Sequence, residues 1–200
     1  IGTVVAFMQS AKWAGRMDNC RGLHPAYGTQ VMLSIESLLN HANLPESPTP
    51  RLDAELLLAH ALGKSRSYLH TWPERELPAE LIATFEACVA RRRSGEPVAY
   101  ILGRQGFWSL ELDVANHTLI PRPDTELLVE TALALLPTTP LAVLDLGTGS
   151  GAIALALACE RPVWQVVGVD RVPEAVALAS GNRERLQLNN AAFAESHWFA

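Results

Sequence analysis

A glycine-rich turn between an apolar run and an apolar helix constrains the fold of this chain more than any other feature. Residues 141–144 are apolar, Asp145 follows them, residues 147–151 read Gly-Thr-Gly-Ser-Gly, and residues 152–158 are all alanine, isoleucine or leucine. This order predicts a strand, a tight turn and a helix, in which glycine lets the backbone approach a nucleotide-like ligand closely. The pattern therefore indicates a cofactor-binding α/β fold. The chain ends soon after the turn, at residue 200, and we expect the α/β domain to be incomplete.

Composition and charge narrow the classes of function. Apolar residues make up 48% of the chain and the net charge is −5, so a packed core is expected and direct nucleic-acid binding is not. The dense basic run, residues 91–93, falls at the end of a predicted helix. It is interpreted as a cation cluster that faces the negative end of the helix dipole, with an RNA or ribosome contact as the alternative.

The cysteines and the apolar segments indicate a cytoplasmic protein with no membrane partner. Cys20, Cys88 and Cys159 are odd in number and far apart, so neither a disulfide framework nor a metal site is predicted. No apolar run approaches the roughly 20 residues that span a membrane. The apolar start of the chain is followed, not preceded, by Lys12, which is the wrong order for a signal peptide.

The first 95 residues are predicted to divide into a leader and a small helical domain. Residues 1–31 carry no sustained period, and we expect them to be extraneous or disordered. Residues 33–95 carry helical patterns, and the predicted helices are 33–39, 51–62, 65–72 and 78–93. The expected buried positions are Leu52, Leu56, Ala59 and Leu62 in the second helix, and Leu81, Phe85, Cys88 and Val89 in the fourth.

Residues 96–118 are expected to form a β-hairpin connector. Residues 98–114 are rich in aromatic and β-branched side chains, and residues 103–106 offer a turn because they begin and end with glycine. Phe107 and Trp108 are interpreted as hairpin core, with contact to a substrate as the alternative.

Residues 119–200 are predicted to alternate helix and strand. A helix is expected up to about Leu136, with Asp124 or Thr125 as its cap and Arg122 anchoring the loop before it, or binding a ligand. The further elements expected are strands at 141–146, 165–169 and 192–196, and helices at 151–160 and 173–188. This alternation implies parallel strands joined by right-handed crossovers.

The glycine turn by itself leaves the ligand open. Gly147 and Gly149, with Ala152, also fit the dinucleotide fingerprint, and Asp170 at the end of the next strand would bind ribose hydroxyls in either an NAD enzyme or an S-adenosylmethionine (SAM) enzyme. Asp145, placed to meet a cationic aminoacyl tail, and the early third glycine favour SAM. A purely structural glycine turn is the remaining alternative.

Longer motifs carry a resemblance to a known family. Residues 119–126 (LIPRPDTE) and 144–154 (LDLGTGSGAIA) closely resemble the release factor glutamine methyltransferases, and residues 51–55, 92–97 and 107–108 look like the helical domain and hairpin of that family. The resemblance spans about residues 33–200. It implies a small helical N-terminal domain for substrate recognition, a β-hairpin, and a truncated Rossmann-like, class I SAM-dependent methyltransferase domain from residue 119.

The resemblance also implies a function and a cofactor site. The family uses SAM to methylate the side-chain amide of the glutamine in the Gly-Gly-Gln loop of class-1 peptide chain release factors, which would be the protein partner. Asp170 would accept from the ribose, and Trp198 would lie beside the adenine, although His197 stands where an acid usually precedes that tryptophan. The turn would pass under the amino-acid and ribose parts of SAM through Gly147, Thr148, Gly149, Ser150 and Gly151.

One motif implied by the resemblance is missing. The family grips the substrate amide with an Asn-Pro-Pro-Tyr motif, and this sequence contains no Asn-Pro dipeptide. No catalytic residue is therefore assigned, and we expect an N-terminal fragment that is inactive alone, since the amide must be held in line with the methyl group. The alternatives are an NAD-linked oxidoreductase and a non-catalytic module that binds release factors.

Overall fold

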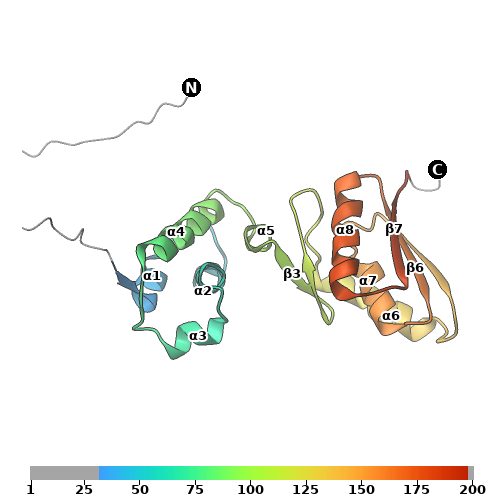
Figure 1. Cartoon of the computed structure of the whole chain (residues 1–200), viewed down its shortest axis with the longest axis horizontal. Helices are drawn as coiled ribbons and strands as arrows, with labels where there is room; N and C mark the ends of the chain where they lie inside the picture. The colour runs from blue at the N-terminus through green and yellow to red at the C-terminus, as the bar shows by residue number, and fades with distance from the viewer. Residues whose placement is uncertain (1–31, 198–200) are drawn as a thin grey trace, which may run out of the picture. The chain divides into compact units, whose positions relative to one another are not determined.

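The computed structural model describes residues 32–197, so the prediction for residues 1–31 lies outside the described part. The elements of that part are drawn in Figure 1. Within it, hydrophobic side chains gather into two clusters. One cluster lies among the helices of the N-terminal half, and the other joins the β-hairpin to a parallel sheet and its helices. The boundaries predicted between the domains remain a prediction.

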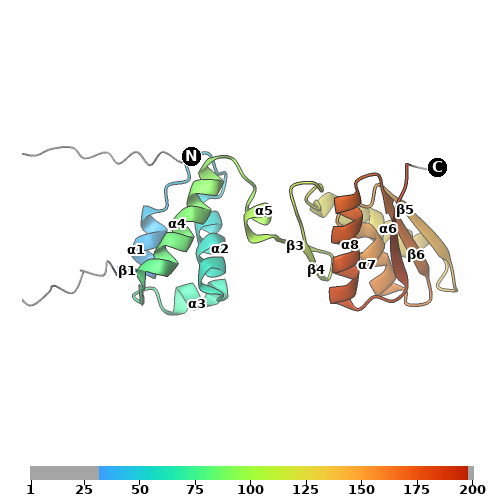
Figure 2. The same cartoon turned by 45° about the horizontal axis from the view of Figure 1, so that its top comes forward.

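The N-terminal half is helical, as the sequence predicts. Helices α1, α2 and α4 lie side by side (Figure 2), with α3 after α2 and the short α5 after α4. The bounds are α1 (Ile35–His41), α2 (Pro50–Leu62), α3 (Arg66–Thr71), α4 (Ala79–Arg93) and α5 (Val98–Leu102). The two-residue strand β1 (Leu33–Ser34), which directly precedes α1 along the chain, pairs antiparallel with the two-residue strand β2 (Glu76–Leu77). Gly63 caps α2 in a left-handed conformation, so this helix ends at Leu62 as predicted.

The buried side of α2 differs from the prediction. Leu52 is 38% exposed, whereas Asp53 and Glu55 are buried beside Leu57 and Leu58. The leucine spacing is misleading because the two acids are buried with cationic partners, and charged side chains are buried in proteins when they are paired in this way. In α4, likewise, Ile82 and not Leu81 joins Phe85, Cys88 and Val89 in the core.

The basic run of α4 is fixed by local partners. Arg92 donates from Nε to Asp53 at 2.7 Å, and Ser47 donates its hydroxyl to the same carboxylate. Arg91 pairs with Glu96, and Arg93 donates to the main-chain oxygen of Asn43. These partners support the structural interpretation of the run, through ion pairs and not through the helix dipole alone.

Replacing Glu55 by glutamine is expected to lower the free energy of unfolding at pH 7 by about 1–3 kcal/mol, the scale of hydrogen bonds to charged groups. Arg66 Nη2 donates to Glu55 at 2.6 Å and Arg51 Nε at 3.1 Å. Burial would raise the pKa of Glu55, but these hydrogen bonds, with the charges of His70 and Arg66, outweigh it and hold the pKa below its ordinary value.

The sign of the pH dependence follows from the lowered pKa of Glu55. The stabilisation is present above the unfolded pKa of about 4.3, and it is lost as the pH falls through the lower folded pKa. Urea unfolding of the wild type and of Glu55→Gln between pH 7 and pH 3 measures this effect. The difference between their free energies of unfolding should become smaller as the pH falls. The exposed Glu36→Gln serves as control, with a change of less than about 0.5 kcal/mol. A difference for Glu55→Gln that is the same at every pH would contradict the assignment.

The β-hairpin exists, but it is shorter than predicted and turns elsewhere. Residues 98–102 form α5, and Gly103 is the left-handed cap of that helix, not a hairpin turn. Strands β3 (Arg104–Phe107) and β4 (Leu110–Asp113) pair antiparallel and turn at Trp108, whose φ is +56°. This left-handed conformation, rare for a bulky residue, is held by Glu126, which accepts from the Trp108 N–H, and Glu160, which accepts from its indole N–H.

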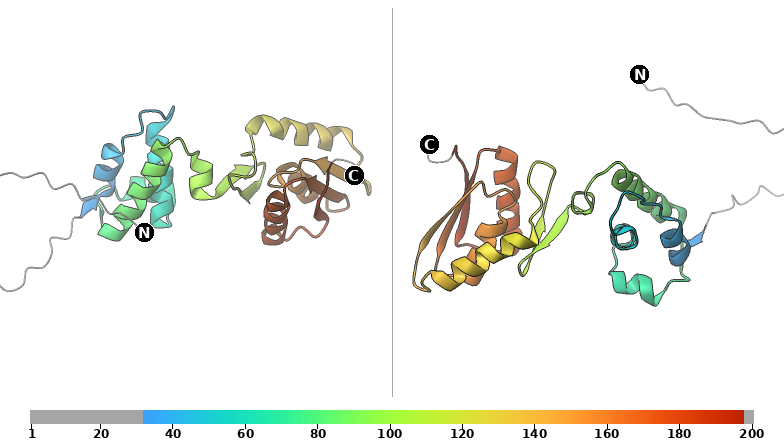
Figure 3. Two further views of the ribbon diagram at one scale, coloured as in Figure 1. Left: turned by 90° about the horizontal axis from the view of Figure 1, so that it is seen from above. Right: turned by 180° about the vertical axis from the view of Figure 1, so that it is seen from behind.

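The C-terminal half is a three-stranded parallel sheet with helices. The order is β5-β6-β7, with bounds β5 (Ala142–Leu146), β6 (Gln165–Asp170) and β7 (Ala191–Glu195). Helices α7 (Ala152–Glu160) and α8 (Pro173–Leu186) connect the strands, and α6 (Glu126–Leu135) packs against α7 (Figure 3). These elements confirm the predicted α/β class and alternation.

The two faces of this sheet differ. Helices α7 and α8 contact one face, where Val166 is buried. On the other face, Leu144 pairs in register with Val167, and their side chains are 53% and 38% exposed. The sheet therefore presents an apolar face that no described element covers.

The start of α6 corrects two predictions. Residues Pro123–Thr125 form a 3-10 turn. Thr125 occupies the N-cap position of α6, as one of the two predicted candidates, but neither Asp124 nor Thr125 makes a side-chain cap hydrogen bond to α6. Within residues 32–197 Arg122 is exposed and has no hydrogen bond or ion pair from its side chain, so it does not anchor the loop through such a contact.

Candidate cofactor-binding site

The glycine turn lies at the carboxyl ends of the strands and is held by backbone hydrogen bonds. The N–H groups of Gly147 and Thr148 both donate to the carbonyl of Val169, at 2.8 and 3.0 Å, and Gly151 N–H donates to Thr148. Gly147, Gly149 and Gly151 have φ values of +77°, +56° and +83°. All three lie in the left-handed region that glycine adopts without strain, so the sequence pattern has its direct cause in the backbone.

The glycines serve different purposes. A side chain on Gly147 or Gly149 would meet no atom within 4 Å, so both face open space. A Cβ on Gly151 would lie 3.0 Å from Leu155 and from the ring of Phe193. The first two positions therefore leave room for close approach to a ligand, whereas Gly151 lets α7 pack against the sheet.

Thr148 and Asp145 brace the turn from inside. Thr148 is buried and donates its hydroxyl to Asp145 Oδ2 at 2.7 Å. Loss of hydration raises the pKa of Asp145 above its ordinary value, helped by the charge of Asp170 and opposed by hydrogen bonds from Thr148 and the Ala154 N–H. Asp145 does not line the pocket described below, and the contacts that the structure gives its carboxylate are those with Thr148 and the Ala154 N–H. A contact with the aminoacyl tail of a ligand remains a prediction.

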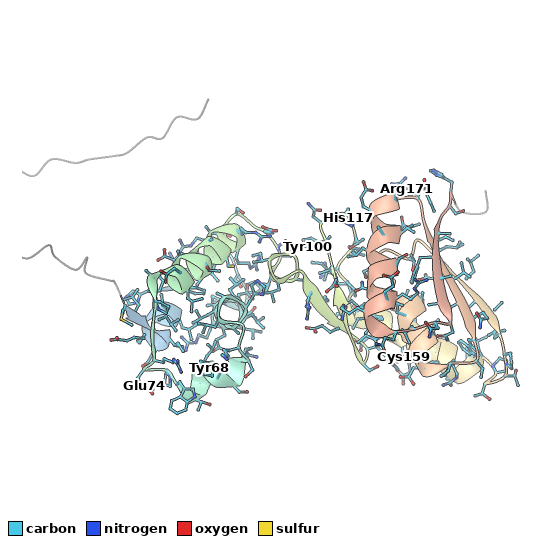
Figure 4. The ribbon with its side chains drawn as sticks, in the orientation of Figure 1. Tyr68, Glu74, Tyr100, His117, Cys159 and Arg171 are labelled. Carbon is cyan, nitrogen blue, oxygen red and sulfur yellow. The ribbon has the colours of Figure 1, made fainter. Side chains whose placement is uncertain are left out.

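Asp170 joins the turn to a pocket. Its Oδ2 accepts from Gly149 N–H and its Oδ1 from Val172 N–H, both at 3.0 Å. The pocket has a volume of about 200 Å³ and lies where β5, β6 and β7 end, lined by Leu146, Gly147, Val169, Asp170, Arg171 and Ser196. Figure 4 shows Arg171 at this end of the sheet, with Cys159 at the opposite end. Each carboxylate oxygen of Asp170 keeps a second lone pair for a ligand hydroxyl.

The structure brings most of the predicted site residues together. Gly147 and Asp170 line the pocket, Gly149 bonds to Asp170, and Thr148 and Gly151 support the turn from below. Ser150 is buried, and its carbonyl accepts from the side chain of Asn182. Trp198 lies outside the described residues. Which of these atoms contact a cofactor remains a prediction.

Sequence reasoning missed three supporting residues. Phe193 of β7 lies under the turn, and Gly168 of β6 makes room for it, because a Cβ there would be 2.5 Å from the Phe193 ring. Asn182 of α8 is fully buried and hydrogen-bonded to the turn. Two signals were available: a glycine inside an apolar strand, which marks a close approach, and an asparagine inside a helix, where it is a poor helix former.

The site fits the nucleoside end of SAM. Open space over Gly147 and Gly149 and an acid at the end of β6 are what a ribose with two hydroxyl donors requires. Among residues 32–197 no cluster of three or more His, Cys, Asp or Glu side chains is arranged to hold a metal ion. None of the described helices is both long enough and apolar enough to cross a membrane.

The comparisons with known proteins first define a class. Residues 31–103 match the family model described as "PrmC N-terminal domain", and residues 138–200 match the model described as "Methyltransferase domain". Together with the parallel sheet and its glycine turn, the second match defines an α/β methyltransferase domain, whose cofactor is SAM. It supports the methyltransferase prediction over the NAD-linked oxidoreductase.

Individual relatives then show which proteins the chain resembles. Curated proteins named "Release factor glutamine methyltransferase" are 66% identical over 169 residues in Pseudomonas aeruginosa and 51% over 173 residues in Aliivibrio fischeri, in each case 84% of this chain and 61% of the relative. The Escherichia coli K12 protein of that name is 50% identical over 80% of this chain and 57% of its own length. Over the matched length, the chain is similar to release factor glutamine methyltransferases. It spans about three-fifths of the length of these relatives.

Proposed function

We propose that the protein of which these residues are part transfers a methyl group from SAM to the side-chain amide nitrogen of a glutamine in class-1 peptide chain release factors, within their Gly-Gly-Gln motif. The observation that carries the proposal is the bond between Gly149 N–H and Asp170 beneath open space, in a chain 66% identical to a relative of that name. The proposed location is the cytoplasm, where release factors act.

The residues of this chain would hold the cofactor. SAM supplies an electrophilic methyl group on a positively charged sulfur. Asp170 would accept hydrogen bonds from the ribose hydroxyls while its other contacts keep Gly149 in place. The open backbone at Gly147 would let the amino-acid part of the cofactor lie directly on the turn. Rate enhancement would come from holding the amide nitrogen in line with the methyl group, in a site that excludes water.

The test is methyl transfer by the whole protein to a release factor with labelled SAM. One methyl group is expected on the glutamine of the Gly-Gly-Gln motif, located by mass spectrometry of the digested product. A release factor with alanine in place of that glutamine serves as control and should take no label. Absence of transfer, or transfer to adenine in DNA, would overturn the proposal.

The 200-residue chain is predicted to be inactive alone, because it holds no Asn-Pro dipeptide to begin the motif that the family resemblance places around the amide. The same assay with this chain should give no labelled release factor. A chain that binds release factor without any affinity for SAM would instead favour the binding-module alternative for these residues.

A further inference from the structure

Asn182 lies in the middle of α8, far along the chain from both segments that it contacts. Its side chain is fully buried. Nδ2 donates to the carbonyl of Ser150 at 3.0 Å and to the carbonyl of Asp113 at 2.9 Å. Oδ1 accepts from Asp113 N–H at 2.7 Å and from Arg185 Nη2 at 2.9 Å.

These four contacts use the full hydrogen-bonding capacity of the amide, which has two donors and two lone pairs. The amide group cannot be reversed, because Asp113 presents both a donor and an acceptor to it. Buried and fully satisfied, such a network fixes the groups that it joins. The single side chain thus ties the end of β4 to the cofactor turn.

The contact with Ser150 sets the plane of the peptide before Gly151. The carbonyl of this peptide bonds to Asn182, and its N–H bonds to Thr148 at 2.9 Å. With both ends held, the turn has little freedom to rotate at its third glycine. The conformation that leaves Gly147 and Gly149 open therefore depends on a residue outside the turn.

The hairpin is tied to α8 by a second side chain as well. Arg185 donates from Nε to the Asp113 carboxylate at 3.1 Å and from Nη2 to the carbonyl of Glu111 at 2.6 Å. Because Arg185 also bonds to Asn182 Oδ1, a shift of β4 is passed directly to the amide that holds Ser150.

We propose that Asn182 is a positioning residue for the cofactor, through which the hairpin sets the conformation of the glycine turn and hence the affinity for SAM. This inference rests on the proposed function in one respect only, that the turn binds SAM. The wild-type chain tests that point separately, because failure of its own binding to SAM would count against the proposed function and not against the role of Asn182.

Asn190 provides a matched control in the same half of the chain. Its Nδ2 donates to the carbonyls of Ala158, Arg161 and Trp164, all away from the turn. Asn182→Ala and Asn190→Ala thus each remove an amide that joins backbone segments, but only the first removes a bond to the turn. A merely structural role for Asn182 would give both variants the same behaviour.

The experiment is titration of SAM into the 200-residue chain by calorimetry, well below the unfolding temperature of each variant. Loss of one hydrogen bond of about 1 kcal/mol corresponds to a rise in Kd of about five- to tenfold. We expect that rise for Asn182→Ala and a change under twofold for Asn190→Ala. Equal Kd values for the two variants, or rises that follow their losses in Tm, would overturn the proposal.

Arg185→Met keeps the experiment decisive if Asn182→Ala does not fold. Arg185 is partly exposed, and its replacement leaves the Ser150 contact in place while loosening the hairpin. The expected rise in Kd is about two- to fourfold, which is smaller because the replacement only weakens the bond between Asn182 and Ser150 and does not remove it. In the whole protein, both variants should raise KM for SAM with kcat changed less than twofold. An unchanged Kd in Arg185→Met would contradict the coupling to the hairpin.

Discussion

Replacement of Gly168 by alanine is expected to destabilise the sheet half of the chain and to weaken cofactor binding together. The new Cβ would lie 2.5 Å from the Phe193 ring and 2.6 Å from Thr148 Oγ1, both closer than real Cβ contacts allow. Relief would require a shift of β7 or of Thr148, which braces the turn through Asp145. Overpacking of this kind costs about 1–3 kcal/mol.

The measurement is thermal unfolding, in which a change of 1 kcal/mol moves Tm by roughly 2–4 °C for a chain of this size. Gly181→Ala in α8 is the control, because a Cβ there would meet nothing within 4 Å. It should leave the protein unchanged or stabilise it by about 0.5–1 kcal/mol, since alanine favours the helix. Adding Phe193→Leu to Gly168→Ala should restore part of the loss, and a Gly168→Ala protein with wild-type Tm would disprove the close packing.

Replacement of Asp170 by alanine is expected to raise the Kd for SAM by about 10- to 100-fold. This corresponds to a loss of roughly 1.5–3 kcal/mol of binding free energy, the scale of hydrogen bonds to a charged group. The variant loses the proposed ribose acceptor and also releases the N–H groups of Gly149 and Val172. Both effects act on the same pocket, so the loss of affinity should exceed that from any single contact in the turn.

Calorimetric titration of SAM measures this effect. Glu160→Gln is a suitable control, because this acid accepts from the Trp108 indole away from the pocket lining, and the glutamine retains an acceptor there. Its Kd should stay within twofold of wild type. If Asp170→Ala bound SAM as tightly as wild type, the ribose would have to be held elsewhere, and the proposed site would be wrong.

Much of the fold could be predicted from local patterns, and the failures have physical causes. The glycine turn, Asp170 at the end of β6 and the alternation of helix and strand depend on neighbouring residues, which a sequence displays directly. The buried side of α2 depends on Arg92 and Arg66 finding Asp53 and Glu55, and such pairing across the fold leaves no periodic trace.

The predicted position of the hairpin turn was wrong for a related reason. Glycines normally mark a turn, but here Gly103 ends a helix and the strands turn at Trp108. Glu126 and Glu160 stabilise that conformation from other elements. Likewise, the role of Asn182 depends on Asp113 and Ser150 meeting in space, so only the unusual presence of an asparagine in a helix could have indicated it.

The hydrogen bonds that hold the glycine turn have a consequence for the entropy of cofactor binding. The turn is held by hydrogen bonds within the protein, to Val169, Asp170, Thr148 and Asn182. Its shape is therefore formed before a ligand binds. A cofactor that enters such a preorganised cradle need not order the backbone, so little conformational entropy is lost on association. Discrimination between the cofactor and its demethylated product must then come from contacts near the sulfur, because the turn binds both molecules equally well.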